Sequence, residues 1–184
     1  MSASTCVRTA ETSRLSSEEL TSLRAMFDAA WHGKDDAFSD HDWRSATGGT
    51  HFLLEIDGAI VSHASVVDRV LETRGRDLRA GYVEAVATRS EHRRRSHATQ
   101  VMLAVGAFIA GRYELGALGT GLFRFYDRMG WERWRGPTGV RMRTGVVRTP
   151  DEDGFIMVLR TPATPPDLDL DALLTCGWRP GDVW

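Results

Sequence analysis

One segment in the middle of the chain restricts the fold most: a strand pattern, a basic loop and a helix pattern follow one another directly. Leu78–Thr88 is rich in Val and Tyr, His92–Arg95 is basic, and His97–Arg112 carries apolar residues at helical spacing. Unpaired N–H groups and the dipole at a helix start favour anions, and arginines add charge-assisted hydrogen bonds. The unit is therefore suited to a phosphate or pyrophosphate, although a solvated basic turn or a nucleic-acid patch fits the same residues. Neither a Walker loop nor a dinucleotide fingerprint is present.

The other patterns predict one mixed α/β domain over residues 1–184. Ser16 and Glu19 form a capping box that predicts a helix over 15–31, whereas residues 32–49 are expected to be a loop. Asp57-Gly58 separates two apolar runs and predicts a hairpin. Further elements are expected as strands at Leu115–Leu118 and within 139–160, and as a short helix at Leu122–Met129 that ends at Gly130.

Charge and cysteine content narrow the class of protein. The net charge of −2 lacks the basic excess of a dedicated nucleic-acid binder. Two cysteines make a disulfide framework improbable, and no apolar stretch approaches the roughly 20 residues that span a bilayer. The N-terminal segment lacks the apolar core of a secretory signal. We expect a cytoplasmic protein without a membrane or nucleic-acid partner.

The basic loop resembles a superfamily motif. Arg93-Arg94-Arg95-Ser96-His97-Ala98 is similar to the Gln/Arg-x-x-Gly-x-Gly/Ala pyrophosphate loop of the GCN5-related N-acetyltransferases, known as GNAT enzymes. Ser96 stands where that superfamily prefers its first glycine. The resemblance implies a mixed, mostly antiparallel central sheet flanked by helices, and acetyl-coenzyme A as the co-substrate.

Nearly the whole chain resembles one family within that superfamily, the aminoglycoside 2'-N-acetyltransferases. The segments that carry this resemblance are Thr47-Gly48-Gly49-Thr50-His51, Gly81-Tyr82-Val83-Glu84, Tyr113–Leu118 with Tyr126 and Gly130-Trp131, and Cys176–Trp184. No requirement of the fold demands the last of these segments. The resemblance implies an antibiotic-inactivating enzyme, and relatives of this family often form homodimers.

The resemblance also implies roles for individual residues. Glu84 is expected to take a proton from the amine through water, and Tyr126 to act as the acid near the thioester sulfur. The main chain of Val86 and Thr88 is expected to bind pantetheine, with the Val86 N–H polarising the thioester carbonyl. From the residue types alone, a surface acid and a core aromatic are the alternatives for Glu84 and Tyr126. The remaining cofactor-binding residues are expected to be Arg93, Arg94, Arg95, Ser96, His97, Ala98 and Thr99.

Three acidic segments suit a substrate with several amines, because separated carboxylates can pair with separate ammonium groups. The acceptor contacts implied by the resemblance are Glu84 together with Asp36, Asp42, Glu152, Asp182 and the Trp184 carboxylate; the neighbouring Asp35 is an alternative to Asp36. Solvated acidic loops are the simpler interpretation of any one segment, and no EF-hand spacing or other metal site is expected.

The sequence leaves the identity of the substrate open. Gly119–Phe123 is shorter and more apolar than the corresponding stretch of the family, which admits a kasugamycin-type aminoglycoside. An enzyme of the same fold that acts on a polyamine or a peptide amine is a second possibility. A non-enzymatic domain that binds coenzyme A or nucleic acid is a third, although the acidic segments would repel phosphate backbones.

Overall fold

A computed structural model describes residues 6–33 and 37–184. It divides into two compact units, of which the first comprises Met1–Val67 and Val83–Val105 and the second Asp68–Tyr82 and Gly106–Trp184. Three elements contribute to both units: β3 (Ala59–Thr73), β4 (Arg76–Thr88) and α3 (His97–Ala110). The single domain expected over residues 1–184 stays a prediction, and each unit is described by itself.

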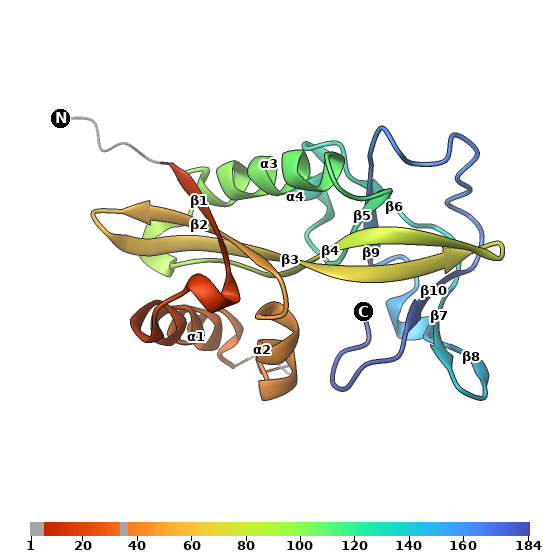
Figure 1. Ribbon diagram of the computed structural model, residues 1–184, viewed down its shortest axis with the longest axis horizontal. Helices are drawn as coiled ribbons and strands as arrows, with labels where there is room; N and C mark the ends of the chain where they lie inside the picture. Colours follow the sequence, from red (N-terminus) through yellow and green to blue (C-terminus); the bar gives the residue numbers. More distant parts are fainter. Residues whose placement is uncertain (1–5, 34–36) are drawn as a thin grey trace. The chain divides into compact units, whose positions relative to one another are not determined.

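Four neighbouring strands build the first unit, in the order β1-β2-β3-β4 (Figure 1). β1 (Val7–Glu11) and β2 (Thr50–Ile56) pair antiparallel, as do β2 and β3. Asp57 and Gly58 join β2 to β3 with φ values of 51° and 78°, both in the left-handed region that a type I′ hairpin requires. The predicted hairpin is therefore confirmed, whereas β1 was not predicted.

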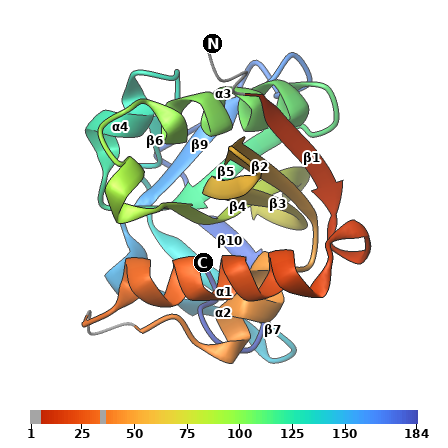
Figure 2. The ribbon, with the colours of Figure 1, turned by 90° about the vertical axis from the view of Figure 1, so that its left-hand side faces the viewer.

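Two capped helices pack in the first unit. α1 (Ser17–Trp31) has the predicted capping box between Ser16 and Glu19, and its apolar face contributes to a core cluster that includes Leu53 of β2. Figure 2 shows α1 and α2 on the same side of strands β1–β3. α2 (Asp40–Ala46) makes the prediction of a loop over 32–49 wrong. A second capping box, between Ser39 and Asp42, begins this short helix.

The second unit contains the remaining strands on both sides of β3 and β4. β5 (Leu115–Gly119) pairs parallel with β4 and antiparallel with β9 (Ile156–Arg160), which in turn pairs with β6 (Glu132–Arg133). On the other side, β10 (Leu174–Gly177) joins β3 to β7 (Thr138–Met142), and β7 pairs with β8 (Gly145–Arg148). β4·β5 and β7·β10 are parallel pairs, and the other pairs named here are antiparallel. The mixed, mostly antiparallel sheet is confirmed.

Helices complete the second unit. α4 (Phe123–Asp127) occupies the predicted short helix, and the chain leaves it through Gly130 at φ 83°. Ile109, near the end of α3, approaches β4 so closely that a Cβ on Gly81 would lie 2.9 Å from its side chain. A short 3-10 turn lies at Pro150–Glu152, and the first unit has two such turns, at Thr12–Arg14 and Ser90–His92. The strands β6 and β10 lie outside the predicted segments, and residues 139–160 hold more strands than the one or two expected.

The Thr47–His51 segment has a packing role. A Cβ on Gly49 would lie 2.0 Å from the carbonyl oxygen of Val66 on the paired strand β3. No side chain fits there, because the obstacle is backbone rather than a flexible side chain. The neighbouring Gly48 meets its nearest atom, Ser45 O, only at 3.3 Å. The second glycine of this segment is therefore required by the strand pairing, independently of any ligand.

Gly49→Ala should destabilise the protein by about 3 kcal/mol or more, since β2 and β3 must separate to admit the methyl group. Gly48→Ala is the matched control and should cost less than about 1.5 kcal/mol. Urea denaturation of both variants measures the difference. Equal losses would show that the approach of β3 is not what requires glycine.

Candidate active site

The basic loop places three guanidinium groups at the surface before α3. Arg93, Arg94 and Arg95 are exposed, and Arg93 Nε donates a hydrogen bond to Thr88 O at 3.3 Å. That contact ties the loop to the end of β4. The remaining N–H groups of the three side chains are directed to solvent or are available to an anion, as a pyrophosphate site requires.

The first turn of α3 begins at a residue with unusual backbone geometry. Ser96 has φ 61°, a left-handed conformation that L residues other than glycine, asparagine and aspartate seldom adopt. Gln100 N donates to Ser96 O at 3.1 Å, so the N–H groups of residues 97–99 precede the first intrahelical bond. His97 is buried, and its two ring nitrogens have no hydrogen-bond partner among the described residues. The chain thus keeps the conformation of a glycine-containing anion loop with serine in that position.

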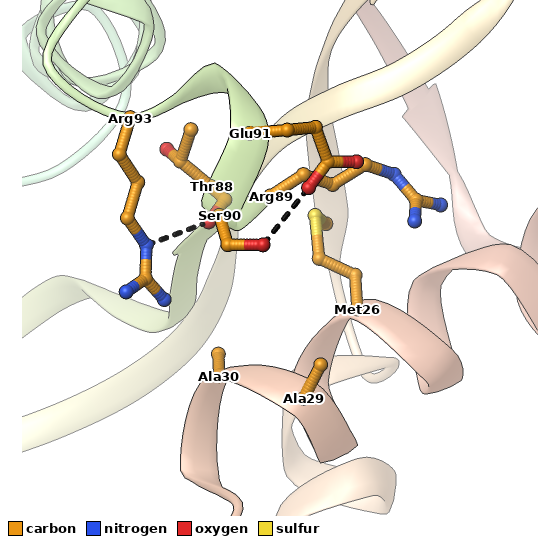
Figure 3. A pocket seen from close by; sticks show the side chains of 8 residues that line it. All are labelled: Met26, Ala29, Ala30, Thr88, Arg89, Ser90, Glu91 and Arg93. Atoms are coloured by element: carbon orange, nitrogen blue, oxygen red, sulfur yellow. Dashed lines mark hydrogen bonds between the residues drawn. The ribbon is translucent and has the colours of Figure 1, made fainter.

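A small cavity lies beside this loop in the first unit. It has a volume of about 80 Å³ and is lined by residues of α1 and by Thr88, Arg89, Ser90, Glu91 and Arg93. Figure 3 shows Met26, Ala29 and Ala30 of α1 facing the Thr88–Arg93 segment across it. Ligand sites for whole cofactors are usually about 300–1,000 Å³, so this cavity can accept only part of one.

β4 is interrupted at Ala85, between the predicted base and the predicted carbonyl-binding N–H. Ala85 has φ 49°, and a left-handed residue within a strand is typical of a β-bulge. Side chains of β3 bind backbone carbonyls around it: Ser65 Oγ donates to Glu84 O at 3.4 Å and Ser62 Oγ to Ala87 O at 3.1 Å. Glu84 and Val86 are half-buried on either side of the bulge. The left-handed residue thus lies directly between the two groups, within a strand that continues from Arg76 to Thr88.

Two fully buried histidines adjoin this bulge. His63 Nδ1 lies 2.9 Å from Ala85 O, and His63 Nε2 lies 2.8 Å from His51 Nδ1. Burial lowers the pKa of His51 to about 4 and that of His63 to about 3, so both rings are neutral near pH 7. His51 belongs to a segment that the sequence singled out, but neither histidine was expected to serve the site.

The predicted acid, Tyr126, lies in α4 of the second unit. Its ring is buried and packs edge-on against Phe125 and Trp131, with centroid separations of 4.9 and 6.0 Å. Burial raises the pKa of Tyr126 to about 12, which keeps the phenol protonated throughout the neutral range. The hydroxyl is therefore a hydrogen-bond donor at any working pH.

Two segments of the second unit, linked by one hydrogen bond, hold three predicted acceptor contacts. The buried Trp184 donates its indole N–H to Thr149 Oγ1 at 2.9 Å, and Glu152 N donates to Thr149 O at 3.0 Å. Asp182 Oδ1 accepts the Trp184 N–H at 3.0 Å. Trp184 thus joins the C-terminal segment to Thr149, three residues before Glu152, whereas the bonds given for Glu152 and Asp182 are local to their own turns.

Two arginines that were not predicted hold the segment after β10. Arg69 Nη2 donates to the carbonyls of Gly177 and Val183 at 3.1 and 2.7 Å, and Arg179 Nε donates to Asp182 O at 2.6 Å. Their guanidinium carbons lie 4.8 and 5.7 Å from the centre of the Tyr82 ring. Cys176, fully buried, donates its thiol to Val183 O at 3.1 Å. Arg179 and Tyr82 stand in segments that carry the resemblance, whereas Arg69 had no sequence signal.

The remaining predicted acceptor contacts come from the N-terminal half of the sequence. Asp42 Oδ2 accepts from both Ser39 N and Ser39 Oγ at 2.8 Å, so one of its oxygens begins α2. Asp36 and the alternative Asp35 lie outside the described residues. Asp42, Glu84 and the cofactor loop belong to the first unit, while Tyr126, Glu152, Asp182 and Trp184 belong to the second.

Within residues 6–33 and 37–184, no group of three or more His, Cys, Asp or Glu side chains has the arrangement of a metal site. In the same residues, no helix has the length and apolar character to cross a bilayer.

Comparison with known proteins gives the family. Residues 11–134 match the acetyltransferase (GNAT) domain family. A relative from Mycolicibacterium fortuitum, described as an aminoglycoside 2'-N-acetyltransferase, is 43% identical over 181 residues, which cover 96% of this chain and 91% of the relative. The chain belongs to the GNAT acyltransferases and, within them, to the aminoglycoside 2'-N-acetyltransferase family.

Solved GNAT structures share the fold at low identity. YhbS from Escherichia coli, solved in complex with CoA, superposes with a TM-score of 0.64 at 14% identity and covers 96% of this chain and 91% of its own. A GNAT acetyltransferase from Brucella melitensis, in complex with acetyl-CoA, gives a TM-score of 0.59 at 13% identity over 89% of this chain and 94% of its own. GNAT homologues thus bind CoA or acetyl-CoA, and the three exposed arginines before α3 have the charge that a pyrophosphate site requires.

Substitution of Ser96 tests the loop of this GNAT enzyme. Ser96→Val should weaken CoA binding about tenfold or more, because a β-branched residue strongly disfavours φ 61° and the loop would rearrange. Ser96→Gly is the matched control and should bind within about threefold of the unchanged protein, since glycine adopts this conformation readily. Calorimetric titration with CoA distinguishes the two, and equal weakening would contradict the backbone explanation.

The buried histidines predict sensitivity to acid. Their pKa values in the folded state, about 4 and 3, lie below the ordinary value of 6.5, so the unfolded chain binds more protons between these limits. Stability should be full above pH 6.5 and fall as the pH decreases towards 4, by on the order of 2–4 kcal/mol between pH 7.5 and 5. Urea denaturation across this range measures it. The His51→Gln, His63→Gln double variant should lose less than half as much, and an undiminished loss would assign the effect to other groups.

Proposed function

We propose that this enzyme transfers the acetyl group of acetyl-coenzyme A to the 2'-amino group of an aminoglycoside and so inactivates the antibiotic. The observation that carries the proposal is the 43% identity to the Mycolicibacterium fortuitum enzyme, which extends over 96% of this chain. The hydrogen bond from the Trp184 indole to Thr149, which brings the C-terminal segment beside the turn that holds Glu152, supports the same substrate class.

In this proposal Arg93–Arg95 and the N–H groups of residues 97–99 hold the pyrophosphate, and the main chain of Val86 and Thr88 holds the pantetheine arm. The interruption at Ala85 supports this assignment, because it frees the adjoining main chain from the regular ladder. The Val86 N–H then stabilises the oxyanion that forms when the amine attacks the thioester.

Glu84 is the proposed base, acting on the ammonium through water. An aminoglycoside ammonium must become neutral before it can attack, and a carboxylate is a suitable acceptor for that proton. Ser65 Oγ binds the main chain of Glu84, which orients the residue independently of its carboxylate.

Tyr126 is the proposed proton donor to the leaving sulfur. Its pKa of about 12 exceeds the value of about 8.5 for a cysteine thiol, so complete transfer in the free enzyme would be uphill by about 5 kcal/mol. A hydrogen bond from the phenol to the developing thiolate gives most of the stabilisation without that cost. As coenzyme A leaves, Tyr126 gives its proton to the sulfur and takes a proton from solvent, which restores the phenol of the free enzyme.

Thiol release with acetyl-coenzyme A tests the substrate class. Kanamycin B or gentamicin should be turned over, with the product acetylated at the 2'-amine by mass spectrometry and NMR. Turnover of kasugamycin alone would move the enzyme to the kasugamycin-type alternative. If spermidine or a peptide reacts and no aminoglycoside does, the proposed substrate class is wrong.

Tyr126→Phe should lower kcat by about 10²–10³-fold and leave the KM for the aminoglycoside nearly unchanged, since it removes a bond made in the transition state. Steady-state kinetics measure both constants. Phe125→Leu, in the same helix, controls for altered packing. Unchanged turnover in Tyr126→Phe would remove the residue from the mechanism.

Asp182→Asn separates charge from structure at the proposed acceptor contact. The amide oxygen can still accept the Trp184 N–H, so thermal stability should be retained while the aminoglycoside KM rises about tenfold. Asp182→Ala, which also removes that bond, should affect both quantities. An unchanged KM in the Asn variant would show that the carboxylate does not contact the substrate.

A further inference from the structure

A continuous chain of hydrogen-bonding groups runs through the first unit and ends at the β4 bulge. Thr12 Oγ1 lies 2.5 Å from Thr47 O and 2.9 Å from His51 Nε2. His51 Nδ1 lies 2.8 Å from His63 Nε2, and His63 Nδ1 lies 2.9 Å from Ala85 O. The chain therefore has four contacts, and a backbone carbonyl stands at each end.

These four contacts outnumber the protons available to fill them. Both terminal groups are carbonyls and only accept, so each contact needs its own proton from Thr12, His51 or His63. The hydroxyl supplies one proton and each neutral imidazole supplies one, which makes three. With both rings neutral, one of the four contacts lacks a hydrogen bond, and only an imidazolium would complete the chain.

The missing proton allows three tautomeric arrangements. One, with His63 protonated at Nδ1 and His51 at Nε2, sets two lone pairs against each other between the buried rings and is disfavoured, which leaves two. In the first, His63 Nδ1–H donates to Ala85 O, His51 Nδ1–H donates to His63 Nε2, and Thr12 binds either His51 or Thr47 O. In the second, both rings are protonated at Nε2, and the lone pair of His63 Nδ1 faces the lone pairs of Ala85 O. In the first arrangement, the contact that lacks a proton is one of the two made by Thr12. Its hydroxyl can rotate and also lies 3.4 Å from Gly49 O. The first arrangement is therefore the favoured one.

The surroundings keep the extra proton out near neutral pH. Phe27 of α1 packs its ring 4.9 Å from that of His63, so this side carries no charge. Glu11 at the end of β1 favours a proton on His51, but desolvation outweighs it, and His51 disfavours charge on His63. β4 presents the Ala85 carbonyl, with Glu84 as the ionisable residue next to it in the chain. A carbonyl cannot pass a proton on, so the chain cannot act as a relay to Glu84.

We propose that His51 and His63 are positioning residues, which hold β4 in its left-handed turn at Ala85 and thereby place the Glu84 carboxylate and the Val86 N–H for acetyl transfer. The inference rests on the roles proposed for those two residues. Ala85 adopts φ 49° against its intrinsic preference, and the bond from His63 fixes the carbonyl that follows this torsion. A pair of histidines that only filled the core would not need this tautomer.

Nitrogen-15 NMR of the imidazoles in the whole protein tests the geometry without reference to activity. At pH 7.5, His63 should be protonated at Nδ1 and unprotonated at Nε2, and His51 should show the same tautomer. The Nε2–H tautomer at His63 would overturn the inference, because no hydrogen bond to Ala85 O would then exist.

Variants of His63 test the consequence for the reaction. His63→Leu removes the bond to Ala85 O and should lower kcat about tenfold or more with an acceptor KM within about twofold. His63→Asn places an amide N–H near the position of Nδ1 and should restore kcat to within about threefold. Leu23→Ala weakens the same core cluster from α1, at a residue that makes none of the four contacts, and should keep kcat within about twofold at a temperature where it is folded.

Amide hydrogen exchange separates the inference from the proposed function. Exchange at Ala87 should be faster in His63→Leu than in Leu23→Ala of matched stability, and His63→Asn should reverse the change. This result can be read even if no aminoglycoside is a substrate, in which case only the proposed function fails. Equal exchange in the two destabilised variants, or equal losses of kcat, would overturn the positioning role.

Discussion

The interruption of β4 at Ala85 is the feature on which the rest of the first unit depends. A left-handed residue within a strand is typical of a β-bulge, where the regular ladder is locally disrupted. Three carbonyls around it are bound by Ser62, Ser65 and His63, all from β3. These side chains make the irregular backbone of β4 a defined conformation, and the segment from Glu84 to Thr88 can then offer polar groups to a ligand in fixed directions.

The two units supply different chemistry. The first carries the arginine loop, the start of α3 and the Ala85 bulge, which together suit an extended anionic thioester. The second carries Tyr126 and the predicted acceptor contacts Glu152, Asp182 and Trp184, which suit a leaving sulfur and a cationic acceptor. A net charge of −2 for the whole chain hides this segregation. Opposite charges on the two reactants explain why one small protein needs both a basic loop and acidic segments.

Local signals predicted the elements that are determined locally. The Ser16–Glu19 capping box, the Asp57-Gly58 turn and the strand–loop–helix unit around Arg93 each lie within a short window, and each was found there. α2 was missed because its sequence has little apolar periodicity and its capping box ends in Asp42 instead of Glu or Gln. β10 was missed because a four-residue strand is stabilised by β3 and β7, which are distant in sequence.

Roles for Glu84 and Tyr126 came only from resemblance, since their residue types fit surface and core equally well. The histidine pair depends on a diagonal register between β2 and β3, in which His51 faces Ser65 and Leu53 faces His63.

The burial of Cys176 has a practical consequence. Its sulfur lies beneath the Val183 carbonyl, within the segment that Arg69 and Arg179 fasten, so alkylating reagents reach this thiol only when that segment lifts. Burial also raises its pKa, which slows any reaction through the thiolate. Cys6, by contrast, is exposed and would be modified at once. The protein therefore contains its own reporter of opening at the proposed antibiotic site: a rapid and a slow phase of thiol labelling, of which the slow one measures how often the C-terminal segment detaches.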